Sequence, residues 1–174
     1  MERILEQIPR FFSGPNMTLL LESAGLTLAM TITGCLIGFG LAFVLVYLRQ
    51  TPGLWALPLR WICITYVEVF RRIPFIVVIY LVLFFIQAVT PDASLFTIAV
   101  IAICLYAVAY TADIIRGGIE SVPITQVEAA QSMNLSRLQT NIRIVLPQAW
   151  PVIVPPAIAF AVSFIKDTAL VSQV

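Results

Sequence analysis

Long segments without charged side chains constrain this chain more than any other feature of its sequence. The first covers residues 23–48, where 26 consecutive residues carry no charge. As a helix it would extend about 39 Å, more than the roughly 30 Å of a bilayer's hydrocarbon core. Over the whole chain 60% of the residues are hydrophobic and 11% are charged, whereas about a quarter are charged in soluble domains. The sequence therefore predicts an all-α integral membrane protein.

Four membrane helices are expected, and proline positions indicate where they are irregular. The second is expected to be one long helix kinked near Pro74, because its apolar part after that proline is too short to span alone. Pro151, Pro155 and Pro156 predict that the fourth begins irregular or bent. The expected parts are a lead-in at 1–18 and a membrane domain at 19–174, with helices at about 19–48, 54–88, 94–117 and 149–165 and a polar loop at 118–148.

Two glycines of the first helix, Gly34 and Gly38, have the spacing that lets a neighbouring helix approach closely. The third helix is expected to end near Gly117 and Gly118. We interpret the first pair as a packing feature rather than as part of a pore.

Basic residues indicate which connections face the cytoplasm. The connection at 87–94 has none. The basic residues in or beside the other two connections are Arg49, Arg60, Arg116, Arg137 and Arg143. Because cytoplasmic loops carry an excess of lysine and arginine, the polar loop is expected in the cytoplasm and the N-terminus outside.

Several kinds of site are not indicated by the sequence. It contains no histidine, and its three cysteines, Cys35, Cys63 and Cys104, lie singly in apolar segments, which is typical of buried thiols rather than of a metal site or disulfides. No GxxxxGK[ST] string is present, so no ATP site is expected in this chain. The net charge of +1 does not favour a nucleic acid partner.

The polar loop is patterned as a folded element. Thr125 with Glu128, and Ser136 with Gln139, have the spacing of capping boxes, which predicts two short helices. Between them, Asn134 is the residue best suited to the left-handed conformation that ends one helix. We therefore expect two short helices that meet at an angle.

The same loop resembles a family motif. EAA at 128–130 is followed after three residues by Asn134, where the family has glycine, and the loop ends on I-x-L-P at 144–147. This pattern is similar to that of the permease subunits of ABC-type importers, and the strings at 66–74, 109–123 and 164–172 are similar to those of the polar amino acid subfamily. The resemblance implies a loop that docks on an ATPase through Glu128, Ala129, Ala130, Met133, Asn134, Leu135, Ile144, Leu146 and Pro147.

The resemblance also implies a fold, a function and partners. The fold would be the transmembrane domain of a type I ABC importer, with four helices visible here of an expected five, so a truncated chain is expected. The function would be import of a polar amino acid, similar to glutamate, aspartate or glutamine, by alternating access across the bacterial inner membrane. The partners would be ATPase subunits that bind ATP and magnesium, a second permease that is identical or homologous, and an extracytoplasmic substrate-binding protein.

Ionisable residues in or near the apolar segments are candidates for a substrate path, because such groups usually face a bundle interior or a cavity. Glu68 is three and four residues before Arg71 and Arg72, so the three can meet on one helix face. The alternative for these groups, and for Asp113 with Arg116, is a structural ion pair. The candidate path residues are Glu68, Arg71, Arg72, Asp113, Lys166 and Asp167.

Two other function classes are considered. A secondary transporter or channel for small polar solutes is the alternative to an ATP-driven permease. An intramembrane enzyme would need Asp113 and Asp167 as a carboxylate pair, and no catalytic string surrounds either residue. A permease subunit without catalytic activity is therefore expected.

Overall fold

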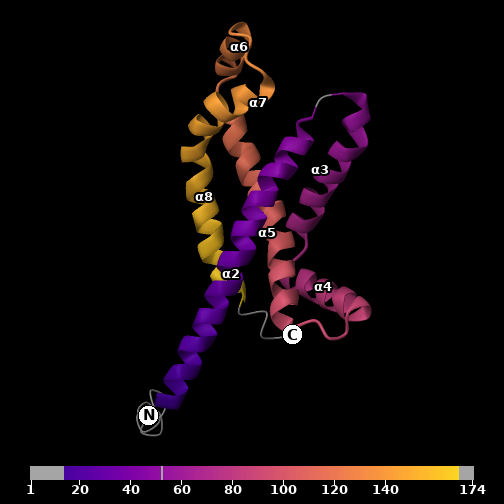
Figure 1. Cartoon of the computed structure of the whole chain (residues 1–174), viewed down its shortest axis with the longest axis vertical. Coiled ribbons are helices and arrows are strands. Elements are labelled where there is room, and N and C mark those ends of the chain that lie inside the picture. The colour runs from indigo at the N-terminus through magenta and orange to yellow at the C-terminus, as the bar shows by residue number, and fades with distance from the viewer. Residues whose placement is uncertain (1–13, 52, 169–174) are drawn as a thin grey trace.

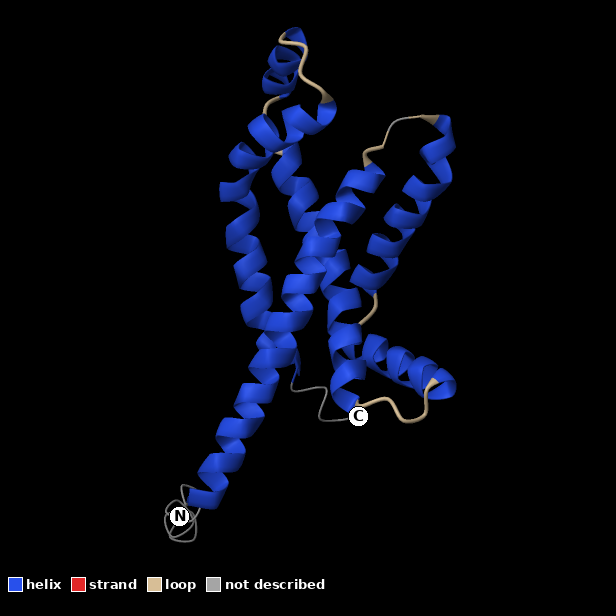
Figure 2. Ribbon diagram, in the orientation of Figure 1, coloured by secondary structure: helices blue, strands red, loops and turns tan. Residues whose placement is uncertain are grey.

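The chain is described by a computed structural model at residues 14–51 and 53–168, and regular structure in these ranges is helical throughout (Figure 2). The all-α expectation is confirmed, while residues 1–13 of the expected lead-in lie outside the described part. The elements are α2 (Gly14–Arg49), the 3-10 turn η1 (Leu54–Ala56), α3 (Leu57–Arg72), α4 (Phe75–Val89), α5 (Leu95–Glu120), α6 (Ile124–Ser132), α7 (Arg137–Thr140), the π-helical turn η2 (Asn141–Val145) and α8 (Leu146–Asp167).

Helix α5 is the centre of the arrangement, and α2, α3, α4 and α8 all pack against it (Figure 1). Ala102, Ile103, Ala107 and Ile115 of this helix have no exposed surface. Small side chains such as alanine let neighbouring backbones approach, which is how membrane helices gain packing contact. The position of α5 therefore determines where the other long helices lie.

Helices α2 and α5 meet at the glycines that the sequence singled out. A methyl group built on Gly34 would lie 2.3 Å from the Cγ2 atom of Ile103, well inside van der Waals contact. Gly38 is similarly close to α5. The predicted close approach is confirmed, and its partner is α5.

A sharp bend separates α3 from α4. The two helices are bent by 115° at the break between them, so the expected single helix with a kink near Pro74 is wrong. Ile73 is extended, with φ −87° and ψ 131°, as residues before proline prefer. Pro74 has no N–H to continue the helical ladder. The chain therefore stops one helix completely and starts another, and we call Ile73 and Pro74 the elbow.

Helix α5 continues past the predicted end at the glycine pair. It begins after Ser94, whose side chain accepts a hydrogen bond from the N–H of Thr97, and it extends to Glu120. Gly118 instead lies where α8 crosses closely, because a methyl group there would meet Ile153 at 2.3 Å. The glycine serves packing at this point, not helix termination.

Helix α8 is continuous, although an irregular start was predicted from Pro151, Pro155 and Pro156, which all lie inside it. The predicted irregularity is absent from α8, since membrane helices tolerate prolines when neighbouring groups satisfy the freed backbone, and the alternative of a bent helix stays a prediction. The irregularity lies immediately before α8, in the π-helical turn η2.

The connections rich in basic residues lie at one end of the molecule. The end of α2, the start of α3, the end of α5, and α6 and α7 are together at the top of Figure 1, and α4 lies crosswise toward the other end. Within the described residues, three helices are long and apolar enough to cross a membrane, at Asn16–Arg49, Leu95–Glu120 and Arg137–Asp167, and the bent pair of α3 and α4 could supply a fourth span.

Candidate functional site

A tight turn joins α6 to the segment that follows it. Asn134 has φ 58° and is the one non-glycine residue of the described chain with a positive φ. The N–H of Leu135 donates to the carbonyl of Ala130 at 3.1 Å, and the N–H of Asn134 donates to that of Gln131 at 2.9 Å. This pair of bonds is the Schellman motif that ends a helix. The predicted role of Asn134 is confirmed.

One of the two predicted capping boxes is present. Ser136 Oγ accepts from the N–H of Gln139 at 3.3 Å, and Gln139 Oε1 accepts from the N–H of Ser136 at 2.9 Å. The box predicted for Thr125 and Glu128 is wrong, because α6 begins earlier, after Pro123, with no side-chain cap. Proline fixes its own φ in a range that suits a helix start, and Thr125 therefore falls inside the first turn.

The EAA residues present two different faces. Glu128 and Ala129 are exposed, and Met133 is 73% exposed. Ala130, in contrast, has no exposed surface, and α6 packs there against η2 and α7. Ala130 thus holds α6 in place, while the acidic, small and flexible side chains around it form an outward surface that another protein could contact.

The I-x-L-P residues make the polar segment continuous with a long apolar helix. Ile144 lies half-buried in η2, Leu146 begins α8, and Pro147 lies in the first turn of α8. From Arg137 to Asp167 the chain has no non-helical residue. Helices α7 and α8 are therefore parts of one continuous helical segment.

The π-helical turn was not predicted, although the sequence holds a signal for it. Pro147 cannot donate to the carbonyl of Arg143, four residues earlier, so the α-helical ladder must change there. A π-helical turn is one of the local changes that helices make.

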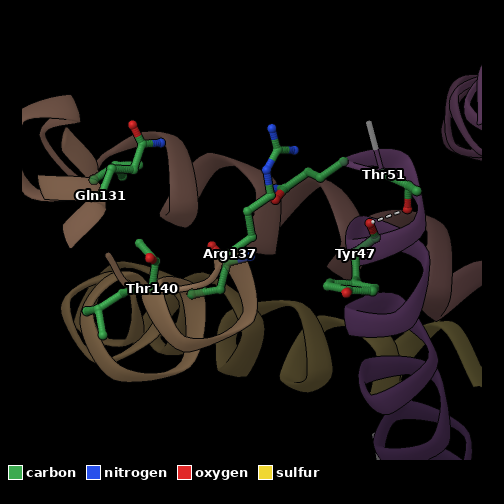
Figure 3. Close-up of a pocket in the computed structure, with 9 residues that line it drawn as sticks. Tyr47, Thr51, Gln131, Arg137 and Thr140 are labelled. Atoms are coloured by element: carbon green, nitrogen blue, oxygen red, sulfur yellow. Dashed lines mark hydrogen bonds between the residues drawn. The ribbon is translucent and has the colours of Figure 1, made fainter. Parts of the chain in front are cut away.

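A cavity of about 250 Å³ lies between the end of α2 and the α6–α7 segment. Figure 3 shows Tyr47 and Thr51 on one side and Gln131, Arg137 and Thr140 on the other. The main-chain carbonyl of Thr51 is also an acceptor for the guanidinium of Arg60 at 2.6 Å from Nε. Sequence reasoning missed this cavity because it depends on where α2 ends in space.

The candidate path residues form ion pairs, but with partly different partners from those predicted. Glu68 pairs with Arg72 at 2.9 Å, whereas Arg71 leaves that helix face and pairs with Asp113 of α5 at 2.8 Å. The expectation that all three would meet is therefore wrong for Arg71. The local pair of Asp113 and Arg116, at 2.9 Å, is as the spacing indicated.

Lys166 and Asp167 lie in the last turn of α8. Lys166 is exposed and Asp167 is half-buried. Neither belongs to an ion pair among the residues that the structure describes, and a substrate role for either stays a prediction.

With this geometry established, comparison with known proteins decides the family. Residues 53–174 match the family of binding-protein-dependent transport system inner membrane components. The chain belongs to this family. Two relatives of this inner membrane component are permeases named for amino acids. The L-cystine transport system permease protein TcyB of Bacillus subtilis is 35% identical over 85% of this chain and 62% of the relative's length. The glutamate/aspartate import permease protein GltK of Escherichia coli is 32% identical over 90% and 72% of the two chains.

Solved structures show the same fold for this inner membrane component. An amino acid ABC transporter crystallised with histidines matches with a TM-score of 0.80 and 27% identity, over 94% of this chain and 75% of that one. The MetNI methionine ABC transporter, in an inward-facing conformation, matches with a TM-score of 0.78 and 25% identity, over 91% and 76%. The expected fold, the transmembrane domain of a type I ABC importer, is confirmed.

Proposed function

We propose that this permease is the membrane-spanning subunit of an ATP-driven importer that moves a polar amino acid into the cytoplasm by alternating access. The observation that carries the proposal is the unbroken helical path from α7 through η2 into α8. It begins at Arg137, after the turn that follows α6 and its proposed docking surface, and it continues into a helix long enough to span a bilayer. Relatives named for glutamate, aspartate, glutamine and cystine transport support the substrate class.

The mechanism requires energy from outside this chain. In the proposal, paired ATPase subunits bind ATP and magnesium, and a second permease, identical or homologous, completes the translocation path. An extracytoplasmic binding protein delivers the amino acid. The docking residues would be the exposed Glu128, Ala129 and Met133, with Asn134 and Leu135 at the turn behind them. Movement of the ATPases would then shift α6 and α7, and α8 with them.

The proposed topology places the α6–α7 segment in the cytoplasm and the N-terminus outside. Both connections that carry basic residues are at the same end of the molecule (Figure 1), which agrees with the excess of positive charge in cytoplasmic loops. The substrate path stays a prediction. Four of its candidate residues are engaged in ion pairs with one another, namely Glu68, Arg71, Arg72 and Asp113. The other two candidates are Lys166 and Asp167.

Transport in vesicles tests the proposal. The permease, the second permease, the ATPase and the binding protein are reconstituted, and uptake of amino acid and hydrolysis of ATP are measured together. Glu128→Arg is expected to abolish most uptake while membrane insertion stays normal, because it reverses the charge of the docking surface. Glu128→Asp is the matched control, since it changes the same position but keeps the negative charge, and it is expected to retain most of the uptake.

Two outcomes would contradict the proposal. Unchanged ATP-driven uptake with Glu128→Arg would remove the docking role. Uptake by the permease alone, driven by an ion gradient and without ATPase, would support a secondary transporter or channel.

A further inference from the structure

Arg71 holds the end of α3 against one turn of α5 through three separate contacts. Its Nη1 atom lies 2.8 Å from Oδ2 of Asp113. Its guanidinium carbon lies 5.8 Å from the ring centroid of Tyr110, within the range of cation–π attraction. The hydroxyl of Tyr110 donates to the main-chain carbonyl of Arg71 at 3.2 Å. Both backbone and side chain of this one residue are thus tied to α5.

The ion pairs continue from Asp113 toward the α6–α7 segment. Its other oxygen, Oδ1, binds Nη2 of Arg116 at 2.9 Å. Arg116 binds Glu120 through Nη1 at 2.7 Å, and Glu120 is the last residue of α5. A chain of four alternating charges therefore connects the elbow with the end of α5 that leads into α6.

The pair of Arg71 and Asp113 is more sheltered than the local pair of Glu68 and Arg72. The side chains of Arg71 and Asp113 are 37% and 25% exposed, whereas those of Arg72 and Glu68 are 79% and 52% exposed. Partly buried charges are less screened than exposed ones. The pair of Arg71 and Asp113, which joins two helices, is therefore less screened than the pair of Glu68 and Arg72 within α3.

The elbow has little of its own structure to hold its angle. Pro74 supplies no N–H, and Ile73 is extended. In the described part of the chain, the bond from the N–H of Ile73 to the carbonyl of Val69 is the one main-chain bond that ties the elbow back to α3. On the far side of the break, the ring of Phe75 lies 5.1 Å from that of Tyr106 on α5. Contacts with α5 on both sides of the break thus hold the bend.

We propose that Arg71 is a positioning residue for transport, which fixes the elbow to α5 so that movement of the α6–α7 segment reaches α4. Without it, the displacement is absorbed by bending at Ile73 and Pro74. This inference rests on the proposed function, because it describes how that movement crosses the membrane domain.

The test uses the complete transporter, assembled from the permease, the second permease, the ATPase and the binding protein, and compares Arg71→Gln with Arg60→Gln. Arg60 is the matched control because it lies on the same helix and its replacement removes the same charge. Its guanidinium also contacts another segment of the chain, but this contact is with the main-chain carbonyl of Thr51 in the α2–α3 connection and not with α5. Spin labels at Trp61 of α3 and Phe85 of α4, which are 66% and 73% exposed, report the elbow angle by pulsed EPR without amino acid present. The three cysteines are first replaced by alanine.

In the parent and in Arg60→Gln we expect one narrow distance between the labels. Arg71→Gln is expected to broaden it and to lower the amino acid moved per ATP about tenfold at saturating substrate, within the usual range of coupling between sites. If Arg71 instead contacted the substrate, Arg71→Gln would raise the substrate concentration needed for half-maximal uptake and leave the distance between the labels narrow. That result would overturn the inference. So would a broadened distance with normal uptake per ATP.

Two further variants keep the test decisive if Arg71→Gln does not assemble. Arg71→Lys keeps the charge but lacks the planar guanidinium, so it is expected to broaden the distance relative to the parent. Tyr110→Phe removes the hydroxyl that donates to the carbonyl of Arg71 and accepts from the hydroxyl of Tyr106, and it is expected to broaden the distance slightly. Distances unchanged in both would overturn the inference. Failure of the proposed function would be visible separately, as absence of ATP-driven uptake in the parent.

Discussion

Gly38 and Ala107 bring the backbones of α2 and α5 together, since a methyl group built on Gly38 would lie only 2.6 Å from Cβ of Ala107. The same methyl group would lie 3.3 Å from the carbonyl oxygen of Cys104. Neither neighbour can rotate away, because one is a Cβ atom and the other belongs to the backbone. The contact between these helices therefore depends on the absence of a side chain at Gly38.

Replacing Gly38 by alanine is expected to destabilise the permease by about 1–3 kcal/mol, the usual cost of overpacking a well-packed core. Gly40→Ala is the control, since no atom lies within 4 Å of a methyl group there. Thermal unfolding in detergent measures the difference. Equal melting temperatures for the two variants would contradict the close contact.

A similar comparison applies to the crossing of α5 and α8. A methyl group on Gly118 would lie 2.3 Å from Cγ1 and 3.0 Å from Cδ1 of Ile153, whereas one on Gly117 would meet no atom within 4 Å. We expect Gly118→Ala to lower the melting temperature and Gly117→Ala to leave it or raise it, because alanine favours helices over glycine by about 1 kcal/mol. The double variant Gly118→Ala with Ile153→Ala is expected to recover part of the loss, and no recovery would place the cause elsewhere.

The turn after α6 gives a test at a single backbone conformation. Asn134→Gly is expected to preserve ATP-driven uptake, because glycine adopts a φ of 58° without strain. Asn134→Val is expected to cost about 1–3 kcal/mol, since branched residues are rarely found there. Uptake in vesicles and protease resistance of the α6–α7 segment measure the effect. Equal behaviour of the two variants would mean that this turn is not needed in the working transporter.

The capping box at the start of α7 predicts a local effect. Ser136→Ala removes the acceptor for the N–H of Gln139, and loss of such a cap costs about 1 kcal/mol. Faster hydrogen exchange is expected at α7, with little change in α5. Ser132→Ala serves as control, because the hydroxyl of Ser132 donates only to the carbonyl of Glu128 within its own helix.

Local patterns in the sequence predicted local structure well. The charge-free segments indicated membrane helices because apolar length is a property of each segment alone. Asn134 and the box of Ser136 with Gln139 were likewise predicted, since their bonds join residues three to five apart. The prediction failed at Thr125 because the neighbouring Pro123 supplies a competing helix start.

Features that depend on neighbouring helices could not be predicted in the same way. The bend at Pro74 was expected only as a kink, and its angle depends on contacts with α5 on both sides of the break. Arg71 has two acidic residues in reach of an extended side chain, Glu68 on its own helix and Asp113 on α5, and the packing of the helices selects the second. Spacing along one helix carries no information about that choice.

The five π-helical residues Asn141–Val145 have a consequence for how this protein can vary. A π-helical turn holds about one residue more than an α-helical turn, so the extra residue is taken up within the turn and adds little rotation between the segments on its two sides. Deletion of one residue there would restore ordinary winding while α7 keeps nearly its present orientation about the axis of α8. A change of length by one residue at this turn can therefore be accommodated without changing the direction in which the exposed surface of α6 points.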